Sequence, residues 1–367
     1  MVYAEVDLRA IRENLAHLRD WLPRRVALMF VVKEDAYGHG LIPVAKAAAE
    51  IVDWFGVANL QEALALRKMG LSQPIFLMIP PVGEELVGAI RAGFHVPLGD
   101  LGMLPELEEA ARRARKKALV HMEIDTGMGR FGLLPEEAEK ALAAFNPNYI
   151  ELAGIFSHLS SAYGTAPEDL EFTRAQVWWF RKILQEWEGR VEAPWKHLAN
   201  SAAVLAFHEA TAPPLNMVRV GTAAYGYPEG PAKPPVPLRP AARVWTEIAA
   251  VREVPTGWPV GYGREFVTER PARLAILAAG YSHGLRPELR DVLVRDRRAP
   301  LVGKIAMDTV ACDVTEVSKV RRGERALLFG PEVARRGWVC PVLVPVLLSS
   351  RRSFVGAKEK IGTPGRI

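Results

Sequence analysis

The sequence runs Val26-Ala-Leu-Met-Phe-Val-Val-Lys-Glu-Asp-Ala-Tyr-Gly-His-Gly40, so that seven consecutive apolar residues end abruptly in Lys33. An uninterrupted apolar run of this length is typical of a strand buried on both faces, as in a parallel sheet. Lys33 is then expected at the mouth of the sheet, partly removed from water. A desolvated lysine amine loses its proton more readily and can form a Schiff base. Tyr37 and the Gly-His-Gly turn add a phenol and a flexible backbone that suit an anionic ligand.

Short apolar runs recur along the first part of the chain and alternate with segments of helical periodicity. The runs lie at residues 26–32, 54–58, 74–78, 95–98, 118–124, 150–156, 195–199 and 217–220. Eight strand candidates separated by helices predict a (β/α)₈ barrel over residues 1–227. Residues 7–22 have a helical period with Asp7 as a plausible N-cap, and Asn59-Leu-Gln-Glu62 resembles a capping box.

The character of the sequence changes near residue 228. Residues 228–240 contain six prolines, which is typical of a domain boundary. Beyond them, short β-rich segments punctuated by glycine follow at residues 251–254, 274–279, 292–294, 301–305 and 325–329. We therefore predict an α/β chain in which the N-terminal barrel is followed by a mostly-β domain over residues 228–367.

Polar residues follow four further predicted strands. The strings are Glu123-Ile-Asp-Thr-Gly-Met-Gly-Arg130, Ser157-His158, His197-Leu-Ala-Asn-Ser201 and Arg219-Val-Gly-Thr222. Taken singly, each string has an ordinary structural explanation, such as a core histidine or a helix cap. Barrel enzymes, however, carry their catalytic residues at the carboxyl ends of the strands, so the joint placement indicates an active site.

The loops after the seventh and eighth barrel strands commonly bind phosphate. Asn200 and Ser201 are expected to open a helix whose amides favour an anion, and Gly221-Thr222 offers bare backbone amides beside it. Together with Lys33, this anion site predicts pyridoxal 5′-phosphate as the cofactor. Arg219 would face the pyridine nitrogen and disfavour its protonation, which suits racemisation.

Composition limits the class of partner and the compartment. The net charge is +5, but basic residues alternate with glutamates, as over residues 106–117, so a solvated helix face explains them better than a nucleic-acid partner. No stretch approaches the roughly 20 apolar residues that span a membrane. Cys312 and Cys340 show no metal-ligand spacing and do not indicate an oxidising compartment, so we expect a cytoplasmic protein.

Several strings resemble those of the alanine racemases over roughly residues 1–330. Besides the Lys33 segment they are Trp54-Phe-Gly-Val-Ala58, Asp125-Thr-Gly-Met-Gly-Arg130, His197-Leu-Ala-Asn-Ser-Ala202, Arg219-Val-Gly-Thr-Ala-Ala-Tyr-Gly226, Val260-Gly-Tyr-Gly263, Gly280-Tyr-Ser-His-Gly284 and Met307-Asp308. The resemblance implies interconversion of L- and D-alanine for peptidoglycan. It also implies an obligate homodimer in which Tyr262 reaches the partner's site as the second base, opposite Lys33.

The resemblance assigns roles to further residues. Those implied to bind the cofactor are Tyr37, His158, Asn200, Ser201, Arg219, Gly221 and Thr222, and those implied to bind or admit the substrate are Arg130, Met307 and Tyr281, with Asp308 in support. Glu123 stands where many family members have a carbamylated lysine, and we interpret it as a replacement brace for Arg130.

Three other departures concern the entrance and the C-terminus. Ser282-His283 replaces a usual Ala-Asp, and Tyr163 replaces an aspartate, which alters the charge expected along the entrance. From about residue 337 the tail diverges, so that Phe354 occupies the place of a phosphate-binding tyrosine or the tail is unrelated sequence.

Three alternative functions remain at this stage. A racemase of larger or more varied amino acids is the nearest. A decarboxylase of related architecture would use a cysteine followed by aspartate, and Cys312-Asp313 fits this superficially. A non-catalytic pyridoxal-phosphate carrier would need the barrel alone, so the second domain and Tyr262 argue against it.

Overall fold

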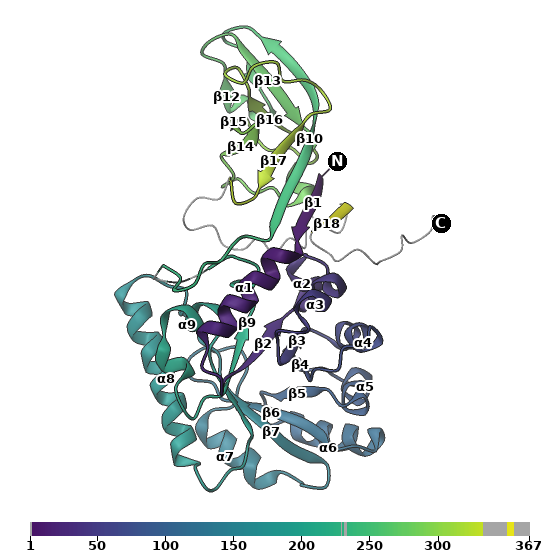
Figure 1. Cartoon of the computed structure of the whole chain (residues 1–367), viewed down its shortest axis with the longest axis vertical. Coiled ribbons are helices and arrows are strands. Elements are labelled where there is room, and N and C mark those ends of the chain that lie inside the picture. Colours follow the sequence, from purple (N-terminus) through teal and green to yellow (C-terminus); the bar gives the residue numbers. More distant parts are fainter. Residues whose placement is uncertain (1, 229, 231–232, 333–350, 356–367) are drawn as a thin grey trace. The chain divides into compact units, whose positions relative to one another are not determined.

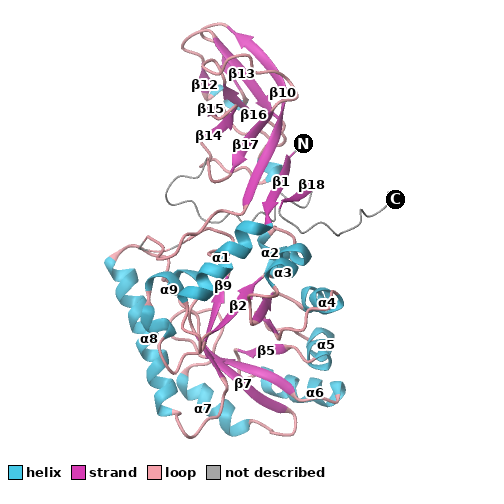
Figure 2. Cartoon of the chain, viewed as in Figure 1, coloured by secondary structure: helices cyan, strands magenta, loops and turns pink. Residues whose placement is uncertain are grey.

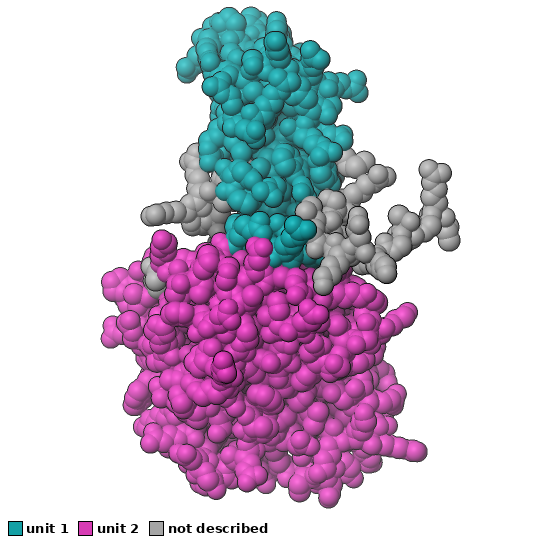
Figure 3. Space-filling model, in the orientation of Figure 1, with its two compact units in different colours: residues 1–10, 37–39, 239–367 teal, residues 11–36, 40–238 magenta. Residues whose placement is uncertain are grey.

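The computed structural model describes residues 2–228, 230, 233–332 and the backbone of 351–355. The chain forms two compact units, coloured separately in Figure 3. We call residues 11–36 and 40–238 the barrel unit, and residues 1–10, 37–39 and 239–367 the sheet unit. Among the described residues, no helix combines the length and the apolar character needed to cross a bilayer.

The barrel unit is a closed ring of parallel strands in the order of the chain, with helices around the outside (Figures 1 and 2). Its strands are β2 (Ala27–Val31), β3 (Trp54–Val57), β4 (Ile75–Leu77), β5 (His95–Leu98), β6 (Ala118–Glu123), β7 (Ile150–Phe156), β8 (Trp195–His197) and β9 (Met217–Val220). The helices are α1 (Leu8–Trp21), α2 (Lys33–Tyr37), α3 (Leu41–Ala48), α4 (Leu60–Lys68), α5 (Glu84–Ala92), α6 (Met103–Ala114), α7 (Pro135–Ala144), α8 (Pro167–Glu186) and α9 (Ser201–Ala206). The predicted barrel is confirmed, strand for strand.

Two predicted helix starts can be compared with the structure. Asp7 Oδ1 accepts hydrogen bonds from the backbone of Arg9 at 3.0 Å and Ala10 at 3.1 Å, as an N-cap does. Asn59 caps α4 by accepting from Glu62 N at 2.9 Å. A capping box would also require the Glu62 carboxylate to accept from the backbone of Asn59. This part of the prediction is wrong, because the carboxylate instead accepts from Ala58 N at 2.9 Å.

The barrel interior combines an apolar cluster with buried polar groups. Ala27, Met29, Trp54, Phe76, Phe156 and Met217 pack together inside. His121, His197 and Arg219 are also buried on barrel strands. Polar groups in a barrel core must hydrogen-bond one another, because their transfer out of water is otherwise unfavourable.

The sheet unit is built on an antiparallel sheet with the order β13-β16-β15-β14-β17-β10-β1-β18. Its strands are β1 (Val2–Asp7), β10 (Ala242–Val254), β13 (Ala272–Leu277), β14 (Asp291–Val294), β15 (Arg297–Val302), β16 (Val310–Asp313), β17 (Arg325–Phe329) and β18 (Arg351–Val355), with β11 (Pro259–Val260) and β12 (Phe266–Val267) forming a separate ribbon. The expected strand at 251–254 is the end of the much longer β10. β1 pairs with β10 antiparallel and with β18 parallel, which groups the first residues with this sheet.

Candidate active site

The turn after β2 has an unusual backbone. Glu34, Asp35, Ala36 and Tyr37 all have φ between 53° and 57°, so α2 winds in the left-handed sense. For residues other than glycine this conformation costs roughly 1–2 kcal/mol each. Strain of this kind is maintained only where the surroundings fix it, and it concentrates at functional sites.

Hydrogen bonds from neighbouring segments hold this turn. The Glu62 carboxylate accepts from Asp35 N at 2.9 Å. The Asp35 carboxylate in turn accepts from Leu41 N at 2.7 Å, and Ala36 N donates to Val32 O at 2.8 Å. The chain is thereby forced to leave β2 with Lys33 at the barrel mouth.

The electrostatic surroundings of Lys33 favour a neutral amine. Burial lowers the pKa of Lys33, and the positive charges of Arg130 and Arg219 lower it further, whereas Glu34 acts in the opposite direction. An amine of lowered pKa is more readily available as a nucleophile and as a base.

Arg219 is a buried cation held by neutral groups. Its Nη1 donates to His197 Nδ1 at 2.8 Å, and its Nη2 donates to Ser157 O at 2.8 Å and His158 Nδ1 at 3.0 Å. Among the described residues no carboxylate forms an ion pair with it. Burial lowers the pKa of Arg219 to about 10, with Glu123 opposing, so the group remains charged at neutral pH.

His158 is positioned as a neutral partner of this cation. Burial and the charge of Arg219 lower the pKa of His158 to about 3, so the ring accepts a hydrogen bond and does not repel the guanidinium. Lys33 and Arg130 contribute to the same shift. The structure therefore brings Lys33, Arg130, His158 and Arg219 into one electrostatic environment at the barrel mouth.

The expected anion site after β8 and β9 is organised differently from the prediction. Asn200 Oδ1 accepts from Ala203 N at 3.0 Å and so serves as the N-cap of α9. Ser201 Oγ accepts from Gly221 N at 2.9 Å and Ala223 N at 3.3 Å. The backbone amide of Gly221, which we expected to be free for an anion, is thus already hydrogen-bonded. The Ser201 hydroxyl only accepts in these bonds, so its own proton can still be donated to a ligand.

Two other residues expected at the cofactor are partly accessible. Thr222 follows Gly221 and is half-buried. Tyr37 is also half-buried, and its carbonyl oxygen lies 3.0 Å from His39 Nδ1. Their predicted roles in cofactor binding stay predictions.

Glu123 and Arg130 do not form the expected direct pair. Glu123 is buried at the end of β6, whereas Arg130 is exposed, and no ion pair joins them among the described residues. Burial raises the pKa of Glu123, and Arg219 opposes this more strongly than Arg130 does. Asp125 shapes the loop that carries Arg130, because its carboxylate accepts from Gly127 N at 2.8 Å and Gly129 N at 3.0 Å.

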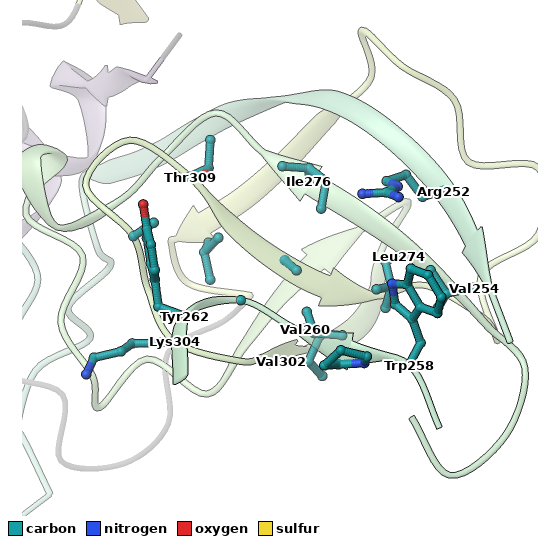
Figure 4. Close-up of a pocket in the computed structure, with 15 residues that line it drawn as sticks. Arg252, Val254, Trp258, Val260, Tyr262, Leu274, Ile276, Val302, Lys304 and Thr309 are labelled. Atoms are coloured by element: carbon teal, nitrogen blue, oxygen red, sulfur yellow. The ribbon is translucent and has the colours of Figure 1, made fainter. Parts of the chain in front are cut away.

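The other predicted site residues belong to the sheet unit. Tyr262 is 72% exposed and lies between Gly261 (φ 74°) and Gly263 (φ 73°), which favour the tight turn that presents it. It lines a pocket of about 390 Å³, and Figure 4 shows it with Lys304 at one end and Trp258 at the other. The same unit carries Tyr281 and Met307, also largely exposed.

Hydrogen bonds join the Tyr281 turn to the Met307-Asp308 turn. Ser282 Oγ lies 2.7 Å from Met307 O and 2.9 Å from Asp308 Oδ1. The neighbouring His283 is tied into its own turn, since its Nδ1 accepts from Gly280 N at 3.3 Å. Two strings that are distant in sequence thus form one surface.

Three further residues from the sequence analysis are Tyr163, Phe354 and Cys312. Tyr163 is 62% exposed in the barrel unit. Phe354 pairs with Val6 through its backbone in β18, but its side chain and the tail around it lie outside the described residues. Cys312 is fully buried in β16, and burial raises the pKa of its thiol to about 12, which does not suit a catalytic acid at neutral pH.

Sequence reasoning missed several groups around this site. Glu62 was recognised only as a helix-capping residue. Tyr225 was noted only within a motif, yet its hydroxyl donates to Val31 O at 3.1 Å and so supports the end of β2. His95 and His121 carried no signal, because single histidines within apolar strands are usually structural.

Comparisons with known proteins agree with this geometry. The alanine racemase N-terminal domain model matches residues 6–229, and the alanine racemase C-terminal domain model matches residues 241–338. The chain is 38% identical over 340 residues to alanine racemase 2 of Caldanaerobacter subterraneus, covering 90% of this chain and 86% of that protein. It is 36% identical to the alanine racemase of Thermobifida fusca, covering 89% and 88%.

A similar match is found among solved structures. The crystal structure of alanine racemase from Streptomyces lavendulae superimposes with a TM-score of 0.84 at 32% identity, and the match covers 98% of each chain. Two domain models, relatives above 30% identity and a structure of the same fold all lead to one assignment, and this chain belongs to the alanine racemase family.

Proposed function

We propose that this protein interconverts L-alanine and D-alanine with pyridoxal 5′-phosphate as cofactor. The observation that carries the proposal is Lys33, an amine of lowered pKa at the mouth of a closed barrel, in the electrostatic environment of a buried Arg219 whose guanidinium is hydrogen-bonded to neutral groups. The names of the relatives support alanine as the substrate.

The donor groups present fit this cofactor. Lys33 supplies the amine that an aldehyde requires, and Arg219 supplies a cation that does not readily give up a proton to a pyridine nitrogen. Ser201, Thr222 and Tyr37 carry hydroxyls suited to a phosphate group. When bound, pyridoxal phosphate withdraws electrons from the substrate α-carbon and so makes its proton removable.

The chemistry requires one base on each side of the α-carbon, because inversion returns a proton to the side opposite its removal. We assign Lys33 to the α-proton of D-alanine and Tyr262 to that of L-alanine. Arg130, Met307 through its backbone amide, and Tyr281 would hold or admit the substrate carboxylate. Asp308 would support the Met307 turn, to which Ser282 is hydrogen-bonded.

Because the proposal needs Tyr262 from a second chain, we infer a homodimer with shared active sites. The exposure of Tyr262, Tyr281 and Met307 on the sheet unit supports this, since large apolar groups exposed together are typical of interaction surfaces. We place the reaction in the cytoplasm, where its product would supply peptidoglycan synthesis.

The test replaces the lysine. Lys33→Ala should abolish the cofactor adduct that borohydride fixes to the wild-type Lys33 peptide, as detected by mass spectrometry, and should abolish racemisation. Lys46→Ala is the matched control, because Lys46 is exposed on α3 and should leave both properties unchanged. A borohydride-fixed adduct that persists at full yield in Lys33→Ala would refute the assignment.

The same preparation can separate the alternative substrates. Racemisation of L-alanine should exceed that of L-serine, L-lysine and L-arginine, and a preference for a larger amino acid would redirect the proposal to a racemase of different specificity. The buried thiol of Cys312 gives no support to decarboxylation. Release of carbon dioxide from any of these amino acids would contradict this conclusion.

A further inference from the structure

Three histidines extend from Arg219 through the interior of the barrel. Arg219 Nη1 lies 2.8 Å from His197 Nδ1, and His197 Nε2 lies 2.8 Å from His121 Nδ1. His121 Nε2 lies 3.1 Å from His95 Nδ1. We call His197, His121 and His95 the histidine chain.

The strand register places the three rings in successive layers. His197 on β8 is level with Phe156 and Glu123, while His121 on β6 is level with Gly154, two residues lower. His95, the first residue of β5, is level with Leu119, two residues lower again. The histidine chain therefore runs from the mouth of the barrel to the start of its strands.

The surroundings of the chain are apolar. The Phe156 ring stacks on His197 with centroids 4.9 Å apart, and the Phe76 and His121 centroids lie 4.8 Å apart. The Trp54 and His95 rings meet edge to face with centroids 4.6 Å apart. Barrel interiors are usually filled by branched apolar residues, so three hydrogen-bonded imidazoles require an explanation.

A glycine makes room for the central ring. A Cβ atom on Gly154 would lie 2.5 Å from His121 Nδ1, closer than any side-chain contact tolerates. Gly154 has no positive φ that would itself call for glycine. The space is therefore reserved for the imidazole that accepts from His197.

The direction of the hydrogen bonds follows from Arg219, which has donors and no acceptor. His197 Nδ1 must accept. Burial lowers the pKa of His197 and His121 well below the usual value, and that of His95 to about 4, so each ring carries one proton at neutral pH. The proton of His197 is consequently on Nε2, which donates to His121, and His121 donates to His95 in the same sense.

We propose that Arg219 sets the tautomer of all three rings, and that the histidine chain in return orients the guanidinium through a neutral acceptor in place of a hydrogen-bonded carboxylate. His121 and His95 are then positioning residues for Arg219. Each donation along the chain enriches the electron density on the preceding Nδ1, which strengthens the bond to Arg219. The link to catalysis rests on the proposed function, whereas the tautomer pattern does not.

The tautomers can be measured without the cofactor. In the full-length protein labelled with ¹⁵N-histidine, long-range ¹H–¹⁵N spectra at pH 7 should show His197, His121 and His95 each protonated on Nε2. Arg219→Met should give mixed tautomers at all three rings, including His95, which Arg219 does not touch. His158→Gln is the control, because His158 also bonds Arg219 but lies outside the chain, and the three tautomers should persist.

Either of two outcomes would overturn the proposal. One is an Nδ1-protonated His121 in the wild type, and the other is a His95 tautomer that is unchanged in Arg219→Met while His197 becomes mixed. Both are independent of activity, so they distinguish failure of this inference from failure of the proposed function.

A second set of variants tests the effect on Arg219. His121→Phe fills the space but neither accepts nor donates, whereas His121→Gln can do both. In His121→Phe we expect kcat to fall about tenfold, with KM little changed and the absorbance of the bound cofactor altered, and in His121→Gln we expect most of kcat to return. If His121→Phe fails to fold, Gly154→Ala, which displaces the His121 ring, takes its place and should show the same fall in kcat. Equal activities of the Phe and Gln variants would show that only the shape of the side chain matters.

Discussion

Glu123 is a buried carboxylate, so its charge should affect the stability of the fold. Burial raises the pKa of Glu123 above the usual 4.5 of a glutamate, so between 4.5 and the folded pKa the folded state binds more protons than the unfolded state. The free energy of unfolding contributed by Glu123 therefore falls as pH rises through the folded pKa. We expect Glu123→Gln, which does not titrate, to gain in Tm relative to wild type as pH rises from 4.5 through the folded pKa.

The control for this measurement is Glu151→Gln, because Glu151 is exposed on β7. Its Tm difference from wild type should stay nearly constant over the same range. A Glu123→Gln variant that loses Tm as pH rises would mean that the charge interaction with Arg219 outweighs burial.

Glu123 also allows a prediction about activity. The carboxylate acts on Arg219 and Arg130 through charge, so Glu123→Gln should reduce racemisation while the protein stays folded. Because a glutamate needs no carbamylation, added bicarbonate should not change wild-type activity. Full activity in Glu123→Gln, or activation of the wild type by bicarbonate, would reduce Glu123 to a structural residue.

Tyr262 and Lys33 should differ in the enantiomer that each deprotonates. Tyr262→Phe removes only the hydroxyl of an exposed side chain, so the fold should be retained. We expect exchange of the α-proton for deuterium to be lost far more from L-alanine than from D-alanine. The measurement is ¹H NMR of each enantiomer in deuterated buffer, and equal losses would indicate a single base.

At the scale of secondary structure, the sequence predicted the barrel strands because each is a short apolar run between helical segments. It did not predict β1 (Val2–Asp7), because its partners β10 and β18 are more than two hundred residues away. The left-handed turn at Glu34–Tyr37 was also unpredictable. Local preferences oppose it, and Glu62 stabilises it from another helix.

That turn leads to a prediction for Glu62. One carboxylate oxygen accepts from Asp35 N and the other from Ala58 N, so Glu62→Gln replaces an acceptor by a donor facing an N–H group. The expected loss is about 1–3 kcal/mol of unfolding free energy, measured by denaturant titration. Glu106→Gln, at an exposed glutamate of α6, is the control. Equal stability of the two variants would mean that Glu62 does not support the turn.

At the scale of the whole molecule, the sequence predicted which polar side chains follow the barrel strands but not how those side chains pair. The histidine chain contacts Arg219 only because the barrel closes. The spacing of these residues along the sequence does not predict their contact. Glu123 and Arg130 form no ion pair among the described residues for a related reason. Strand alternation gives the face of a side chain, whereas its partner depends on the path of the following loop, which Asp125 fixes.

The proposed dimer predicts that two inactive variants restore each other. Lys33→Ala and Tyr262→Phe chains, unfolded together and refolded as a mixture, should pair at random. Half of the dimers are then mixed, and one of the two sites in each mixed dimer has both an intact lysine and an intact tyrosine. Racemisation should recover to about a quarter of the wild-type value.

The control distinguishes shared sites from simple refolding. A chain carrying both substitutions, refolded with an equal amount of wild type, also gives half mixed dimers, but each of their sites lacks one base. That mixture should retain only the activity of its wild-type homodimers, again about a quarter, and refolded Lys33→Ala or Tyr262→Phe alone should remain inactive. If both bases came from one chain, the doubly substituted mixture would retain about half, and the two single variants would give no recovery, because no chain in that mixture carries both groups.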